Sequence, residues 1–246
     1  MAVYELRDED IGRMILSHQQ AAAEVRNKVS GFATRYWGSM SSWRDADIAK
    51  MVDTIVPVVE AGQRTVYQLT DAYLSTVMLA LDDTLEIPRI ESPRMTTLRG
   101  IPAADVYVRP GSTVHAALAN GKSLEEAVQM GLYRLQDIIA MDLQMAQTHA
   151  SRDRLSTSDR VVGYRRVLTG SENCALCAIA STQRYHRGDL MPIHPGCDCT
   201  VAPIMGTHDP GLVINEDLLA ETHTAVSSQL GAYSSDARRK GDYSDI

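Results

Sequence analysis

All four cysteines of the chain lie in one short segment, between Cys174 and Cys199. They form two pairs, with the spacing C-x2-C in the first pair and C-x-C in the second, and a histidine lies three residues before Cys197. Structural zinc takes four such ligands in a tetrahedron, and two pairs on turns joined by a loop are a common arrangement. We therefore expect one structural zinc ion, bound by four of five candidates: Cys174, Cys177, His194, Cys197 and Cys199.

The five candidates compete for four places. Since C-x-C is cramped for two ligands, either Cys197 or Cys199 is left out, or His194 takes an outer position. His186 and Asp189 lie in the loop between the pairs and are candidates for hydrogen bonds to the ligands.

Two other chemistries fit the same cysteines. Two disulfide bonds, each joining Cys174 or Cys177 to Cys197 or Cys199, would close the same loop, but a cytoplasmic chain seldom keeps disulfides. A redox-active C-x-x-C after a strand is compatible with the segment VVGYRRVLTGSENCALC. A thioredoxin-like motif does not need the second pair, so zinc remains the favoured reading.

Composition and charge narrow the class of protein. The chain is 44% hydrophobic, enough to bury a core, and only 5% aromatic, which favours helices over an all-β sandwich. A net charge of -7 argues against a protein that coats nucleic acid. The N-terminus, MAVYELRDED, lacks the basic start and apolar core of a signal peptide, and no apolar run is long enough to span a membrane. We expect no membrane association and a location in the cytoplasm where the protein is made.

Hydrophobic periodicity predicts long helices in the N-terminal part. Apolar residues recur at helical spacing over residues 8–28 and again over 42–82, where Pro57 and Gly62 should kink the helix or split it in two. We expect residues 1–85 to form a helical N-terminal arm. Such an arm would either pack on a partner or bury its own apolar stripe as a helical hairpin.

A Pro-rich connector is expected over residues 86–111, followed by a compact domain over 112–205. Within this domain we predict a short helix, 112–118, ended by Asn120-Gly121, and a helix from Ser123 to about residue 149 that opens with a capping box. Strands are predicted at 161–168 and 200–204.

A C-terminal helix, from Asn215 to about Tyr233, and a polar tail should occupy residues 206–246. The predicted fold class is therefore α+β and mostly helical, with long N-terminal helices followed by a small mixed domain that carries the Cys/His metal-type cluster.

The cysteine segment resembles a known family. The stretches YRRVLTGSENCALC and QRYHRGDLMPIHPGCDCTVAP, with Arg165, Pro195 and the five candidate ligands, resemble the Mu F-like minor head proteins of tailed bacteriophages. The resemblance covers residues 161–204. Asp198 stands where this family often has a basic residue, which argues against a phosphate contact at that turn.

The resemblance implies a role in head morphogenesis. A protein of this kind would associate with the portal protein and with the major capsid or scaffold protein in the host cytoplasm, and would then remain in the virion, in the capsid interior or at the portal vertex. It would also be placed to contact packaged DNA. The candidate contacts for DNA are the basic residues Arg165, Arg166, Arg238, Arg239 and Lys240.

Similar proteins of actinobacterial phages are labelled capsid maturation proteases, so an enzyme is the alternative. Ser171 or Ser181 could pair with His186 or His194, and Cys174 could pair with His194. No G-x-S-x-G or H-E-x-x-H motif occurs, and bound metal would consume the thiolates. We therefore favour a non-enzymatic head protein over a protease.

Overall fold

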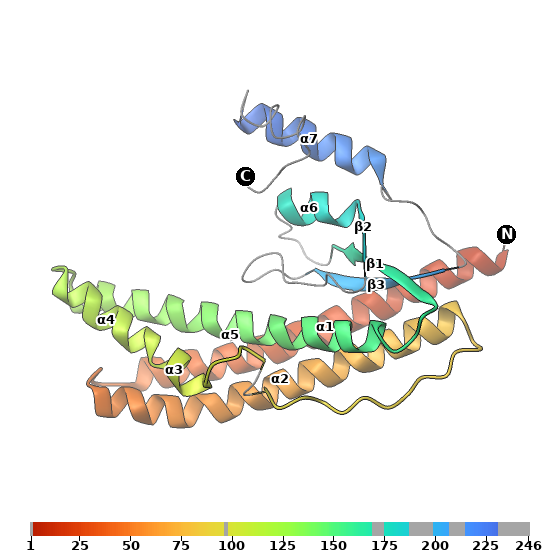
Figure 1. The fold of residues 1–246 in the computed structure, drawn as a ribbon. Coiled ribbons are helices and arrows are strands. Elements are labelled where there is room, and N and C mark those ends of the chain that lie inside the picture. Colours follow the sequence, from red (N-terminus) through yellow and green to blue (C-terminus); the bar gives the residue numbers. More distant parts are fainter. Residues whose placement is uncertain (1, 96–97, 169–174, 187–198, 207–214, 231–246) are drawn as a thin grey trace. The chain divides into compact units, whose positions relative to one another are not determined.

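The computed structural model describes residues 2–95, 98–168, 175–186, 199–206 and 215–230 (Figure 1). The described residues form two compact units, one ending at Thr157 and the other beginning at Ser158. None of the helices in this described part is both long enough and apolar enough to span a bilayer.

The first unit is built on three long helices. Helices α1 (Ala2–Ser39), α2 (Asp45–Leu81) and α5 (Leu124–Leu155) lie side by side, and the shorter α3 (Ala103–Tyr107) and α4 (Arg109–Ala119) complete the unit (Figure 1). The helical periodicity of the sequence thus predicts the type of these elements, but α1 and α5 are longer than expected.

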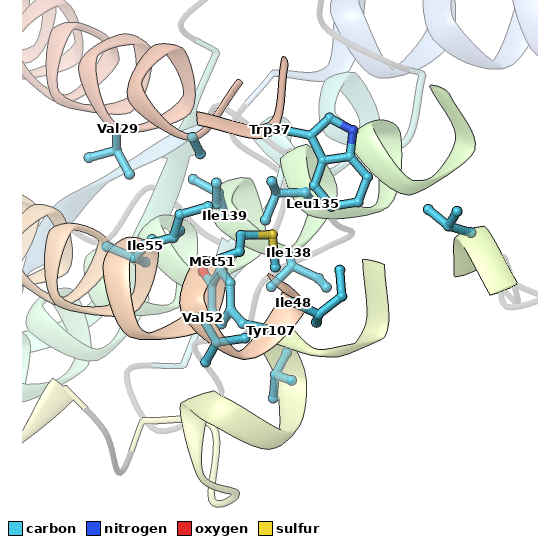
Figure 2. Close-up of a cluster of buried hydrophobic side chains, with 14 of the residues drawn as sticks. Val29, Trp37, Ile48, Met51, Val52, Ile55, Tyr107, Leu135, Ile138 and Ile139 are labelled. Atoms are coloured by element: carbon cyan, nitrogen blue, oxygen red, sulfur yellow. The ribbon is translucent and has the colours of Figure 1, made fainter. Parts of the chain in front are cut away.

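Side chains from α1, α2 and α5 share one hydrophobic core. Figure 2 shows Trp37 of α1, Met51 of α2 and Ile139 of α5 gathered in this core, where each is at most 1% exposed. Complete burial of a side chain of this kind contributes roughly 1.5–3 kcal/mol. The Trp37 indole also donates a hydrogen bond to the carbonyl oxygen of Val128, at 3.2 Å, so its polar group is satisfied where α1 meets α5.

The second helix corrects one prediction. Helix α2 is one continuous helix through Pro57 and Gly62, so the expected split into two helices does not occur. Pro57 lies on the exposed side, whereas Gly62 is buried, and a Cβ added there would approach Val29 Cγ2 to 2.7 Å. Gly62 is therefore a point of close approach between α1 and α2.

The turn between α4 and α5 confirms two predictions from the sequence. At the end of α4, Gly121 has a φ of 79°, which is typical of the left-handed backbone conformation. Its N–H donates to Leu118 O and the next N–H, of Lys122, donates to Ala117 O, which together form a Schellman motif. Helix α5 then opens with the predicted capping box, in which Ser123 and Glu126 each bond the other's backbone N–H.

The Pro-rich segment packs on the bundle. Its residues Met95 and Leu98 are buried in a second cluster with Tyr67 of α2 and with Ala146 and Ala150 of α5. Since α3, α4 and most of α5 pack with the first two helices, the division of the chain falls after Thr157, whereas the proline content predicts it at the connector. The helices of residues 1–85 bury their apolar stripe within this unit, as in the hairpin interpretation.

The second unit contains a three-stranded antiparallel sheet. Strand β1 (Val161–Val167) lies at its centre, between β2 (Arg184–Tyr185) and β3 (Thr200–Met205). Helix α6 (Ala175–Ser181) lies between β1 and β2 in the sequence, and α7 (Glu216–Leu230) packs against α6. Strands β1 and β3 agree with the prediction and β2 was not expected. The predicted α7 also agrees, apart from residues 231–233, which lie outside the described part.

Candidate metal centre

The sheet register brings together the end of β1 and the start of β3, which border the two cysteine pairs in the sequence. Val167, the last residue of β1, pairs with Thr200, the first residue of β3. Cys199 directly precedes Thr200, and the first cysteine pair follows β1 in the sequence, with Cys177 as the third residue of α6. Antiparallel pairing therefore joins the chain just after β1 to the chain just before β3, where the two pairs are located in sequence.

The structure describes two of the five candidate ligands. Cys177 is buried and Cys199 is half-buried, and no disulfide bond joins them to each other. Cys174, His194 and Cys197 lie outside the described residues, as does Asp189. Within the part of the chain that is described, no three His, Cys, Asp or Glu side chains form a group able to hold a metal ion. The predicted zinc site thus remains a prediction.

A buried arginine lies beside Cys199. The Arg166 guanidinium is 3.5 Å from the Cys199 sulfur, measured from Nη1 to Sγ, and the residue is only 8% exposed. Its Cζ lies 5.9 Å from the ring centroid of Tyr164 and 5.5 Å from that of Tyr185, and these two rings stack on each other at 5.3 Å. Burial by itself lowers the pKa of Arg166, but the Cys199 sulfur and the two phenols raise it above its ordinary value. A cation is thus held against a candidate ligand.

The other sequence candidates lie in several environments. Arg165 is exposed and pairs across the sheet with Arg184, so it remains available to an anionic partner. A contact with a DNA phosphate requires an exposed guanidinium. The Arg166 guanidinium is instead buried beside Cys199. His186 is exposed after β2. The tail residues Arg238, Arg239 and Lys240 lie outside the described residues.

The chemistry of the described donors fits a thiophilic metal. Thiolate ligands give a structural zinc centre a net negative charge, and a cationic N–H donor beside one sulfur compensates part of that charge. The geometry supports a nucleophilic role for Ser181 less well than it supports a metal ligand at Cys199. The Ser181 hydroxyl donates its hydrogen to the carbonyl oxygen of Ala178, at 2.7 Å, and not to a histidine base. Ser171, the other serine considered, lies outside the described residues.

The contact of Arg166 with Cys199 was not expected from the sequence. The signal was present in the strand VVGYRRV, because side chains alternate across a sheet and place Tyr164 and Arg166 on one face, with Arg165 on the other. The contribution of Tyr185 could not be found this way, since β2 has only two residues.

Comparison of the chain with protein-family models, with curated proteins and with solved structures finds no match.

Proposed function

We propose that this chain is a minor head protein of a tailed phage, in which a structural zinc ion stabilises the C-terminal unit. The observation that carries the proposal is the motif over residues 161–204, with its C-x2-C and H-P-x-C-x-C segments, which resembles the Mu F-like proteins. The pairing of Val167 with Thr200 supports it, since the two segments flank paired strand ends. The Arg166 cation beside Cys199 supports it further.

In this proposal the protein acts by association. It binds the portal protein and the major capsid or scaffold protein during procapsid assembly in the host cytoplasm and then stays in the virion, where exposed basic residues such as Arg165 contact packaged DNA. Such contacts would be few, so DNA binding would be weak and would fall steeply with salt.

The zinc part of the proposal is tested on the purified full-length chain. Elemental analysis should find about one zinc per chain, because closely spaced thiolates bind zinc tightly. The free energy of this binding then supplies a large share of the free energy of folding. Protein isolated from virions that holds no metal, with both cysteine pairs in disulfide bonds, would contradict a zinc site.

The partner contact is tested by surface substitution. Deleting residues 1–85 would expose the apolar side of α5 and unfold the first unit, so a loss of function would say nothing about docking. Leu16 on α1 is 56% exposed, and Leu118 on α4, at 40%, is a matched control in the same unit. We expect Leu16→Asp to reduce co-purification with the portal protein and Leu118→Asp to leave it unchanged. Equal binding by both variants would place the docking surface elsewhere.

The protease alternative has its own test. Ser181→Ala and His186→Ala remove candidate catalytic groups without touching the candidate ligands, and Ser171→Ala completes the set. For a structural head protein all three should leave phage yield and capsid-protein processing unchanged. A folded variant among them that leaves the capsid protein uncleaved would favour the protease.

A further inference from the structure

The strongest unexplained feature of the second unit is the burial of a permanently charged side chain. Arg166 is 8% exposed, on the central strand of a three-stranded sheet. Burying a guanidinium is costly unless acceptors or negative charge compensate it. The Cys199 sulfur, 3.5 Å from Nη1, is such an acceptor, and it accepts far more strongly as a thiolate than as a thiol.

Two aromatic rings fix the direction of this side chain. Tyr164 lies two residues before Arg166 on the same face of β1, and Tyr185 pairs with Tyr164 from β2. The guanidinium carbon lies within 6 Å of both ring centroids, the range of a cation–π interaction. The rings therefore hold the planar group in one position, and the N–H that reaches Cys199 is preorganised.

We propose that Arg166 is a positioning residue for the metal centre, which donates a hydrogen bond to metal-bound Cys199 and compensates the charge of its thiolate. This inference rests on the proposed zinc site and adds that Cys199, one of the two cysteines of the cramped C-x-C, is a ligand. Outer hydrogen-bonding partners of this kind orient a ligand and tune its affinity for the metal.

The test uses the full-length protein with zinc and with cobalt, which reports on its sulfur ligands through charge-transfer absorption. Zinc affinity, measured by competition with a chelator, should fall about tenfold in Arg166→Gln, as is common when an outer partner of a ligand is lost. The cobalt–sulfur absorption should move to longer wavelength, because a thiolate without its N–H donor gives up electron density more easily. Arg165→Gln is the matched control on the same strand and should change neither quantity.

A double substitution shows whether Arg166 acts through Cys199. In the Cys199→Ser background, Arg166→Gln should cause no further loss of affinity, since the sulfur that it contacts is already gone. A further tenfold loss there would mean a general effect on the unit and would overturn the inference. If Arg166→Gln does not fold, Arg166→Lys replaces it, because an ammonium lacks the planar guanidinium that lies within 6 Å of both ring centroids.

The outcomes separate this inference from the proposed function. A wild-type protein that binds zinc, with Arg166→Gln or Arg166→Lys equal to it in affinity and spectrum, overturns only the role of Arg166. A wild-type protein that binds no zinc overturns the metal centre and the role of Arg166 with it.

Discussion

Tyr107 donates its phenolic hydrogen to Asp142, with 2.8 Å between the hydroxyl oxygen and Oδ2. The other carboxylate oxygen of Asp142 accepts two hydrogen bonds from Arg99, including one from Nε at 2.8 Å. The Asp142 side chain is 8% exposed, so a buried carboxylate on α5 ties down both the segment before α3 and α3 itself. Burial, followed by the adjacent Asp142 charge, raises the pKa of Tyr107 well above its ordinary value and keeps the phenol a donor.

Removing the charge of Asp142 should be the most damaging single change in this network. Asp142→Asn leaves Arg99 without its anionic partner, and breaking a buried pair from one side costs about 3 kcal/mol or more. Tyr107→Phe removes one hydrogen bond to the same carboxylate and should cost about 1–3 kcal/mol. Urea unfolding of both variants measures the difference. Equal losses would mean that the phenol, and not the ion pair, dominates the network.

The stability of the helical unit should fall in acid because of His18. This side chain is buried between α1 and α2, stacked on Tyr73 at 4.5 Å, with Nε2 3.0 Å from Thr70 Oγ1. The Thr70 hydroxyl donates to Val66 O, so it accepts from a neutral His18 that carries its hydrogen on Nε2.

Burial lowers the pKa of His18 from 6.5 to about 4. Between these two values the unfolded chain binds the proton and the folded chain does not, so the unfolding free energy decreases as the pH falls. The contribution is fully present above about pH 6.5 and about 3 kcal/mol of it is lost by about pH 4. Comparison with His18→Gln, which does not titrate, isolates this loss in urea unfolding curves. Parallel pH profiles for the two proteins would exclude His18 as its source.

Two helical glycines should respond to alanine in opposite directions. A Cβ at Gly131 would lie 2.6 Å from Cζ2 of Trp37, a ring that is fully buried and cannot move aside. Overpacking of this kind costs about 1–3 kcal/mol, so Gly131→Ala should lower the melting temperature. At Gly12 on α1 nothing lies within 4 Å of the added carbon, and Gly12→Ala should stabilise the protein by up to about 1 kcal/mol. Thermal unfolding of both variants tests the close approach of α5 to Trp37.

Metal removal should act on one unit only. A chelator that strips the proposed zinc ion from the full-length protein should destabilise the sheet and α6 by several kcal/mol, since a structural metal contributes directly to folding. It should leave the stability of the helical bundle unchanged. Hydrogen exchange with and without chelator measures the protection of backbone amides in each of the two units separately. A uniform loss of protection over α2 and α5 would mean that the units unfold together.

The sequence predicted the helices well because their signals are local. Apolar residues at a period near 3.6 mark the buried stripe of α2, and the capping box at Ser123 and the left-handed Gly121 mark the α4–α5 turn without reference to distant residues. Strands β1 and β3 were also found from β-branched composition. The existence and the type of these helices and strands can be predicted because each depends on a pattern within one segment of the sequence.

What the sequence did not reveal depends on partners far along the chain. From the sequence alone, a single aspartate such as Asp142 would be expected on the solvent-exposed side of its helix. Only the structure shows that Arg99 and Tyr107 donate hydrogen bonds to it. The close packing of Gly62 in α2 against Val29 in α1 is another such case, because periodicity alone cannot show the approach of two helices. The same holds for Arg166, whose neighbour Cys199 lies 33 residues further along the chain.

The pairing of Val167 with Thr200 has a consequence for how the intervening segment can change in length. A sheet register fixes both ends of that segment as neighbours, so inserted residues add only the entropy of a longer closed loop. Each doubling of a flexible loop costs only about 0.6 kcal/mol. Insertions between Tyr185 and His194, which keep the spacing of the candidate ligands, should therefore be tolerated far better than a one-residue deletion within β3, which would shift the register of the residues beyond it against β1.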